Sequence, residues 1–411
     1  MFLTLLCLLE IQQGYCVKSK LLFFAYLSIF LLQIILLEIF NILFKIKYFF
    51  FKNKTKKIDW VFGVEEVASI LRNTSSSIPN SLSINFGNHR FYDFNYDYNF
   101  SNKNKLIFMI ERILFGPILL AKFSHLSSGF FYIWSSRFLI NKIDDGEYEY
   151  SFLKKKDKLI VNFFVGSDIR SPQKAMEFAK ERGDEVTSNY YYLSSPHRLN
   201  KTYEEMIKNR CEITEKYSNM IITSKVDQAS YFIKKTYPFI YFYPDKDFHK
   251  NDKKYQNIKT LKVVHAPSSP IIKGTQLVRS AILRLKKENY IFEYVELINI
   301  SNDEIKDHLK TAHIVLNEFY AHVPGVFGIE ALANYSALMT SADENIETDL
   351  PINSNNAWLV TKSYEIYDNL KFLMNNHHEI KACADRGFEW ARKHASQENS
   401  GKLLSNLLSD L

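Results

Sequence analysis

Two short segments between His265 and Glu330 carry residue types that bind phosphate and sugar. The first, HAPSSPIIKGT (265–275), predicts a strand, a loop of small residues and a helix that opens at Lys273 and Gly274. A lysine at a helix N-terminus suits a phosphate group, because free backbone N–H groups and a point positive charge meet there. The helix end alone contributes at most about 2 kcal/mol to the binding of an anion, so useful affinity for a diphosphate would also need the charge of the lysine. A Lys-Gly pair at a helix start is also ordinary surface chemistry, and this alternative stays open.

The second segment, NEFYAHVPGVFGIEALA (317–333), predicts a strand that ends before Pro324 and Gly325. Residues Val326–Gly328 then lead into a helix that carries Glu330 in its first turn. Backbone amides of a glycine loop can bind an oxyanion, and a first-turn glutamate can accept hydrogen bonds from sugar hydroxyls. The simpler alternative is that Glu330 only complements the helix dipole.

The sequence lacks the motifs of several common nucleotide-binding, hydrolytic and metal-dependent sites. The sequence has no GxGxxG, GxxxxGK[ST], HExxH or GxSxG segment. The four cysteines (Cys7, Cys16, Cys211 and Cys383) form no CxxC and no Cys/His pair with metal-ligand spacing, which disfavours a zinc module and a disulfide scaffold and fits a reducing compartment. Asp245-Lys-Asp247 matches the metal-binding DxD pattern, but it lies in a lysine-rich linker, so we interpret it as a solvated charge run. No metal site is predicted.

The elements that must position these residues alternate short apolar runs with longer amphipathic ones, as in βαβ units. In the first half we expect a strand at Trp60–Phe62, a turn at Gly63, a helix at Glu65–Arg72, and strands at Lys158–Phe164, Met220–Thr223 and Phe239–Tyr243. In the second half we expect strands at Leu261–His265, Tyr290–Leu297 and Ile314–Asn317, with helices at Gly274–Glu288, Asp303–Thr311 and Gly328–Asn334.

A polar, aperiodic stretch at 245–260 separates the two halves. The predicted fold class is therefore α/β, with two Rossmann-like domains that face each other across a cleft and bind ligands at the carboxyl ends of their strands. The predicted units are residues 1–57, 58–250, 259–395 and a closing helix at 396–411.

The N-terminal unit carries most of the charge. The 411-residue chain has a net charge of +7, and residues 1–57 hold eight lysines against two glutamates, so the rest has only one net positive charge and no basic stripe. A nucleic-acid partner is therefore not expected. Residues 21–44 form an apolar run of about 36 Å as a helix, long enough to span a membrane. Six lysines follow this run and two precede it, which places the body on the cytoplasmic face.

Two other interpretations of this segment compete with a spanning helix. A cleaved signal peptide is disfavoured, because the run is long, starts late and is followed by lysines. An amphipathic helix lying in the membrane interface remains open, because Gln33, Glu38 and Asn41 fall on one side of a helical wheel. A spanning helix and an interfacial helix both predict a membrane anchor, whereas a third alternative, a buried helix or a mis-assigned start codon, does not. The sequence indicates no oligomeric state.

The two chemical segments, in this order, resemble the C-terminal domain of GT-B glycosyltransferases of the family 4 type (glycosyl transferases group 1). The resemblance continues in AHIVLNEF, EALANYSALMTSADE and the closing FEWARKHASQENSGKLLSNLL. In the first half, VGSDIRSP (165–172) resembles the family's HGSDIR segment, and DWVFGVEEVASIL is similar to its first strand and loop. The resemblance therefore spans about residues 58–411.

The resemblance implies a hexosyltransferase that moves a sugar from a nucleotide-sugar donor to a saccharide or lipid-linked saccharide acceptor. It implies retention of anomeric configuration, no metal and no cofactor, and a role in bacterial cell-surface polysaccharide or lipopolysaccharide biosynthesis. The implied catalytic residues are Lys273, which neutralises the diphosphate, and Glu330, which binds the ribose. The implied donor site comprises Ser268, Lys273, Gly274, Gly325, Val326, Phe327, Gly328 and Glu330. The implied acceptor side comprises Gly63, Gly166 and Asp168.

Three positions depart from the family pattern. Ser268 stands where many members have an arginine, and Val165 replaces the histidine before GSD. His322 occupies the place of the first acid of the paired-Glu motif, with Asn317 and Glu318 close enough to substitute. These departures keep open an epimerase or phosphorylase on the same fold, and a non-catalytic membrane-bound scaffold.

Overall fold

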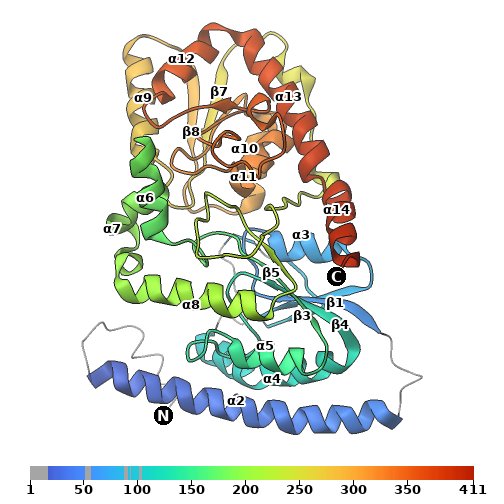
Figure 1. Ribbon diagram of the computed structural model, residues 1–411. Coiled ribbons are helices and arrows are strands. Elements are labelled where there is room, and N and C mark those ends of the chain that lie inside the picture. Colours follow the sequence, from blue (N-terminus) through green and yellow to red (C-terminus); the bar gives the residue numbers. More distant parts are fainter. Residues whose placement is uncertain (1–16, 51–56, 88–90, 93, 101–103) are drawn as a thin grey trace.

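The computed structural model describes residues 17–50, 57–87, 91–92, 94–100 and 104–411. Two parallel sheets form two domains, one above the other in Figure 1. The first sheet has the order β3-β2-β1-β4-β5-β6 and the second the order β11-β10-β9-β7-β8. These are the two common strand orders of doubly wound α/β domains. The predicted pair of Rossmann-like domains is confirmed.

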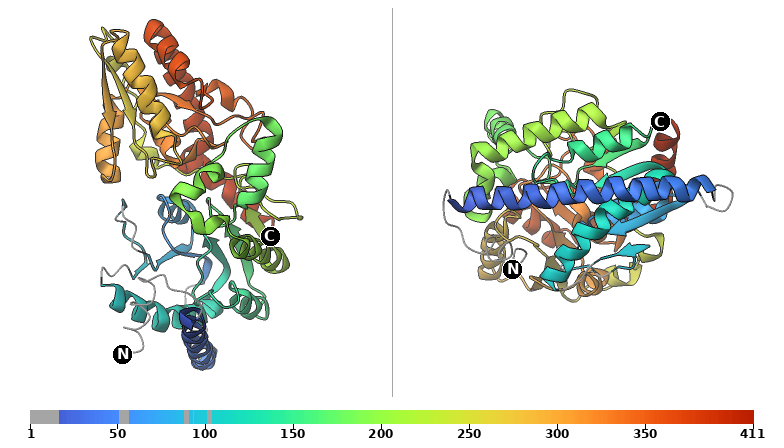
Figure 2. Two further views of the ribbon diagram at one scale, coloured as in Figure 1. Left: turned by 90° about the vertical axis from the view of Figure 1, so that its left-hand side faces the viewer. Right: turned by 90° about the horizontal axis from the view of Figure 1, so that it is seen from below.

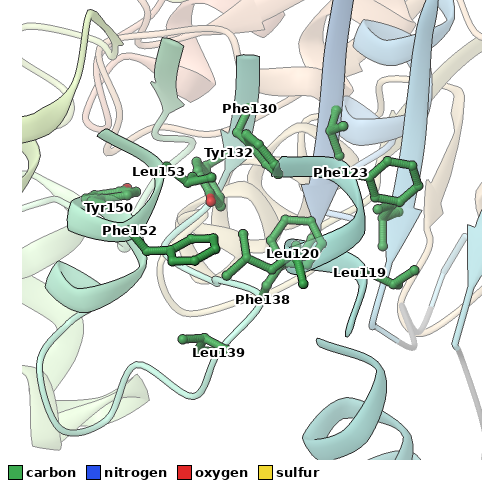
Figure 3. Packing of buried hydrophobic residues seen from close by; sticks show 14 of the residues in the cluster. Leu119, Leu120, Phe123, Phe130, Tyr132, Phe138, Leu139, Tyr150, Phe152 and Leu153 are labelled. Atoms are coloured by element: carbon green, nitrogen blue, oxygen red, sulfur yellow. The ribbon is translucent and has the colours of Figure 1, made fainter. Parts of the chain in front are cut away.

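The N-terminal domain is built on buried apolar strands that helices cover on both faces. Its strands are β1 (Ile58–Val64), β2 (Ser81–Asn85), β3 (Tyr98–Asn99), β4 (Ser127–Ile133), β5 (Leu159–Phe163) and β6 (Met220–Ile222). Its helices include α3 (Ile70–Ser77), α4 (Lys105–Leu126), α5 (Glu147–Lys154), α6 (Pro172–Arg182), α7 (Tyr191–Ser194) and α8 (Lys201–Tyr217). Figure 3 shows one core layer, where Phe123 of α4 and Phe130 of β4 pack among other buried aromatic and aliphatic side chains.

The C-terminal domain follows the predicted order of strands and helices closely. Its strands are β7 (Leu261–His265), β8 (Phe292–Glu296), β9 (Ile314–Leu316), β10 (Ala337–Thr340) and β11 (Leu359–Val360). Its helices are α9 (Thr275–Lys287), α10 (Asn302–Thr311), α11 (Gly325–Ala333), α12 (Ile366–Asn375) and α13 (His377–Ala395). A capping box between Ser301 and Glu304 fixes the start of α10.

The last helix, α14 (Gln397–Ser409), returns to the N-terminal domain beside α3 (Figure 1). Leu404 and Leu408 are buried in the same cluster as Ile70 and Leu71. The chain passes between the domains twice, once near Tyr243 and once near Ser396. Backbone hydrogen bonds join these two segments: the Tyr243 N–H donates to the Ala395 carbonyl (2.7 Å), and the Gln397 N–H donates to the Tyr243 carbonyl (2.8 Å).

Four local predictions were wrong. Gly63 is not a turn but lies inside β1, paired with both neighbouring strands. The first helix begins only at Ile70, after Ala68 and Ser69 in left-handed backbone. Residues 239–243 form no sheet strand, and the segment is an extended connection with single bridges at its ends. Helix α11 starts at Gly325, so Glu330 lies in its second turn and Gly325–Gly328 are helical.

Helix α2 (Val17–Phe50) is long and apolar enough to cross a membrane by length and composition. In the structure it lies across the base of the N-terminal domain and packs along α4 (Figures 1 and 2). Its side chains Ala25, Ile29 and Leu37 are buried in this contact. Cys7, Cys16 and the lysines at 52, 54 and 56 lie outside the described residues.

Candidate functional site

A cavity of about 420 Å³ lies between the two domains, at the carboxyl ends of both sheets. From the N-terminal domain it is lined by Val67, Trp134 and Gly166, which follow β1, β4 and β5. From the C-terminal domain it is lined by Ser268 after β7 and Asn317 after β9. The order of each sheet reverses at these strands, between β1 and β4 and between β7 and β9, and such switch points are where open α/β sheets bind ligands.

Lys273 lies in the cavity wall just before α9, where the sequence places it. Its ammonium group forms an ion pair with Glu318, which follows β9. The Glu318 side chain is buried, and burial raises the pKa of its carboxyl, while Lys273 opposes that rise. Of the two substitutes considered for the missing first acid, Glu318 is therefore the one that contacts the predicted phosphate-binding lysine.

The start of α11 faces the same cavity with Gly325, Val326 and Phe327. Gly325 has a φ of +62°, and a Cβ there would lie 2.9 Å from Oε1 of Glu318. Asn317 donates from Nδ2 to the Pro324 carbonyl (2.6 Å) and so ties the end of β9 to the helix start. Only glycine fits this position without strain, and the backbone amides of the first turn lie next to the Lys273–Glu318 pair.

Glu330 also lines the cavity and is almost fully buried. It accepts a hydrogen bond from Nδ2 of Asn302 (2.8 Å), a residue in the first turn of α10. Burial raises the pKa of the Glu330 carboxyl to about 7, although the Asn302 hydrogen bond opposes the rise. The carboxyl is therefore close to half ionised near neutral pH, and it is held ready to exchange hydrogen bonds with a polar ligand.

Four predicted site residues, three glycines and Asp168, are absent from the cavity lining. Gly274 is the left-handed N-cap of α9 and packs under Phe319 and Tyr320, and Gly328 packs against Asn317 and Pro324 inside α11. Gly63 is enclosed in β1, where a Cβ would lie 3.2 Å from the Ile84 carbonyl oxygen. These glycines allow close packing beneath the site rather than contact with a ligand.

Asp168 supports the loop that does reach the cavity. Its buried carboxylate accepts hydrogen bonds from the N–H groups of Val165 (3.2 Å) and Gly166 (2.8 Å). Burial raises the pKa of the Asp168 carboxyl to about 6, and these hydrogen bonds oppose the rise. Asp168 therefore positions Gly166 on the first-domain side of the cavity.

The sequence interpretation missed the basic residues of the N-terminal domain. Arg170 lines the cavity and forms an ion pair with Asp227 (2.5 Å). Arg198 lines it too, with its guanidinium 5.2 Å from the centre of the Tyr191 ring. Arg170 had a signal, because it ends the GSDIR segment already singled out, whereas Arg198 lies in a stretch without a recognisable motif.

Further contacts hold the two domains together beside the cavity. The Glu347 carboxylate accepts hydrogen bonds from the N–H groups of Lys225 (3.1 Å), Val226 (2.8 Å) and Asp227 (2.8 Å). Burial raises the pKa of Glu347 to about 7. His322 lies on this side and not in the main cavity, and its N–H donates to Oδ1 of Asp227 (3.0 Å). His322 therefore does not take the place of the missing first acid at the cavity.

The DxD residues have other partners. Asp247 pairs with Lys306 (3.2 Å), and Asp245 accepts the N–H of Glu398 (2.9 Å) at the start of α14. Within the described ranges, no group of three or more His, Cys, Asp or Glu side chains is placed to hold a metal ion.

No family model and no curated protein sequence matches the chain. Solved structures do match its fold over most of its length. A sucrose-phosphate synthase from Thermosynechococcus elongatus aligns over 86% of this chain and 99% of its own, with TM-score 0.56 and 8% identity. WaaG, a glycosyltransferase involved in lipopolysaccharide biosynthesis, aligns over 86% and 100%, with TM-score 0.51 and 10% identity.

An alpha-glucosyltransferase, solved in complex with UDP-glucose and DNA containing an abasic site, also aligns over 86% of this chain and 100% of its own. Its TM-score is 0.51 and its identity 10%. At such identities the likeness concerns the arrangement of the chain in space. The chain has the GT-B fold, as its sequence motifs implied.

Proposed function

We propose that this chain is a retaining, metal-independent glycosyltransferase that moves a sugar from a nucleotide-sugar donor to a saccharide or lipid-linked saccharide acceptor. It acts in cell-surface polysaccharide or lipopolysaccharide biosynthesis, at the cytoplasmic face of the cell membrane. The observation that carries the proposal is one cavity at both switch points, in which Lys273, the first turn of α11 and Glu330 converge.

The donor fits the C-terminal wall of this cavity. Its diphosphate binds the positive charge of Lys273 and lies at the N-terminal first turn of α11, and Glu330 accepts hydrogen bonds from the ribose hydroxyls. When the sugar leaves, negative charge grows on the diphosphate, and fixed donors stabilise it without reorganising. Lys273 supplies the charge that a divalent ion supplies in metal-dependent transferases, so the proposal needs no metal.

The acceptor fits the N-terminal wall. The Gly166 loop, held by Asp168, forms its floor, and Arg170 and Arg198 offer hydrogen-bond donors for saccharide oxygens or for the phosphate of a lipid-linked acceptor. The neighbour solved with UDP-glucose makes UDP-sugars the first donors to screen.

The test is donor turnover by the purified protein with a saccharide acceptor. We expect Lys273→Ala and Glu330→Ala to lower kcat/KM by about 10²–10³-fold, the usual loss when one transition-state donor is removed. Lys246→Ala, a lysine change in the linker outside the cavity, is the matched control and should keep full activity.

Three results would contradict the proposal in different ways. Unchanged turnover in both variants would remove the site. A changed sugar without any acceptor, or dependence on inorganic phosphate, would favour an epimerase or a phosphorylase. Calorimetry that detects no binding of any nucleoside diphosphate would favour a scaffold without catalysis.

A further inference from the structure

Helices α2 and α4 together expose a broad apolar surface at the base of the N-terminal domain. We call it the basal face. Its exposed apolar side chains on α2 are Leu21, Phe23, Phe24, Leu31, Leu32, Ile35, Ile39, Ile42, Leu43, Ile46, Phe49 and Phe50. Those on α4 are Leu106, Ile107, Ile110, Leu114 and Phe115. Figure 2 shows the base from below, with α2 crossing α4. A patch of this kind marks an interaction site on a soluble domain.

Two uncharged polar side chains of α2, Gln33 and Asn41, face the protein, whereas the charged ones that the structure describes are exposed. Gln33 is fully buried; its Nε2 donates to the carbonyls of Arg112 and Ile113 (3.3 Å each), and its Oε1 accepts the N–H of Ile140 (2.8 Å). Asn41 lies 2.9 Å from His125 through Oδ1. A water-facing amphipathic helix has the opposite orientation, so the outer side of α2 needs an apolar partner.

These contacts also fix the direction of α2. They begin at Gln33, beside the middle of α4, and continue to Asn41, beside its end, so the helix is tied along the domain over several turns. A helix that crossed a bilayer would have to leave this surface. Gln33 would then enter hydrocarbon without its hydrogen-bond partners, and no water is present there to replace them.

Charge selects the partner. Exposed lysines border the basal face near both ends of α2 and at the start of α4, namely Lys20, Lys45, Lys47 and Lys105. The described parts of the two helices carry only two carboxylates, Glu38 and Glu111, and Glu38 already accepts a hydrogen bond from Tyr148 (3.1 Å). A second copy of the chain would bring lysines against lysines, whereas anionic lipid headgroups complement them.

We propose that the basal face is a monotopic membrane-docking surface, in which α2 lies in the plane of an anionic bilayer and the first half of α4 enters the same leaflet. Both ends of α2 then contact one headgroup layer. Phe49, Phe50 and the neighbouring lysines lie at the boundary between acyl chains and headgroups. The inference stands independently of the transfer chemistry, because vesicle binding and donor turnover are measured separately.

The discriminating variant is on α4. Full-length protein is floated with vesicles of phosphatidylethanolamine and phosphatidylglycerol, and with phosphatidylcholine vesicles for comparison. We expect Ile107→Glu/Leu114→Glu to lower partitioning onto the anionic vesicles by about tenfold or more, because two apolar contacts become charged ones. A spanning α2 would hold the protein on vesicles regardless of α4. The matched control is Leu283→Glu/Ile291→Glu, which charges two exposed apolar residues of the C-terminal domain and should float like the wild type.

Depth gives the second readout, and it does not depend on the α4 variant folding. Single cysteines at Leu21 and Ile46, in a Cys7→Ser/Cys16→Ser background, carry an environment-sensitive fluorophore, while Cys211 and Cys383 stay buried. A water-soluble quencher added outside the vesicles should reach both labels to the same extent. The proposal is overturned if only one label is reached, if the α4 variant floats unchanged, or if the protein without vesicles is a dimer that cross-links through these positions.

Discussion

The Glu330 carboxyl is the residue whose chemistry depends most directly on pH. Because it is buried with a single side-chain partner, its pKa is raised to about 7 from an ordinary value of 4.5. The carboxylate can accept two hydrogen bonds from a ribose, whereas the protonated acid accepts fewer. We therefore expect donor affinity to rise as the pH increases through 7, and this dependence to disappear in Glu330→Gln.

The same group predicts a change in stability, and its sign is fixed. Below pH 4.5 the carboxyl is protonated in both the folded and the unfolded state, so it carries no penalty. Between pH 4.5 and 7 the carboxyl is ionised in the unfolded state but protonated in the folded one, so the wild type loses up to about 3 kcal/mol over this range, and Glu330→Gln does not. Above pH 7 the loss is complete. Denaturant unfolding of both proteins at pH 4.5 and 8 measures this difference. Equal pH slopes would show that the site is more hydrated than the structure indicates.

A substitution at Gly325 tests the proposed diphosphate-binding turn at the start of α11 without removing a charge. Alanine there would combine a positive φ with a Cβ 2.9 Å from Glu318. Gly183 is the matched control, because its φ is +68° and no atom lies within 4 Å of a Cβ. Both alanine variants should lose about 1 kcal/mol from backbone strain, but only Gly325→Ala should also weaken nucleoside diphosphate binding in calorimetry. Equal effects on binding would place the turn away from the donor.

At the scale of elements, α14 belongs to the N-terminal domain although it follows the C-terminal one. Leu404 is fully buried against α3, while its neighbour Leu403 is half exposed. We expect Leu404→Ala to lower the free energy of unfolding by about 2–5 kcal/mol, and Leu403→Ala by less than about 0.5 kcal/mol. Urea denaturation compares the pair, and similar small losses would show that α14 is not part of the core.

The second half of the chain was predictable because its local signals agree. Strand β7 and helices α9 and α10 were placed within a residue or two, since short apolar runs, glycine caps and a capping box coincide there. The strand predicted at residues 239–243 was wrong, because a buried aromatic connection between domains has the same composition as a strand. Helix α2 posed a different difficulty. A helical wheel groups Gln33, Glu38 and Asn41, but only tertiary contacts show that Gln33 and Asn41 face the protein while Glu38 stays exposed.

The residues of the candidate site also divide into those that local sequence signals predict and those that only the fold brings together. Lys273 and Glu330 could be placed at the cavity from sequence because a turn signal precedes the helix near each of them, although Glu330 lies one turn further into its helix than predicted. Glu318 was one of two alternatives that only its contact with Lys273 separates. Arg198 could not be found at all, since it reaches the cavity from a loop that only the fold brings close.

On the scale of the whole molecule, the basal face and the cavity lie at different distances from the end of the molecule that α2 forms. Helix α2 lies at one end, the C-terminal domain forms the other, and the cavity lies between them (Figure 1). A bilayer under α2 would leave the C-terminal domain, the proposed donor-binding domain, in the aqueous phase, where nucleotide-sugars dissolve. The N-terminal domain, with Arg170 and Arg198, would stay nearer the surface on which a lipid-linked acceptor diffuses.

The paired crossings at Tyr243 restrict how such a molecule can move. Because its backbone is hydrogen-bonded to both Ala395 and Gln397, the outgoing and returning strands of chain meet at one point. This connection ties the two domains at one edge, so we expect any opening of the cavity to be a rotation about it. Such a rotation would have to break three sets of hydrogen bonds: those from Lys225–Asp227 to Glu347, that from the His322 N–H to Asp227, and that from the Thr187 N–H to the Tyr320 carbonyl.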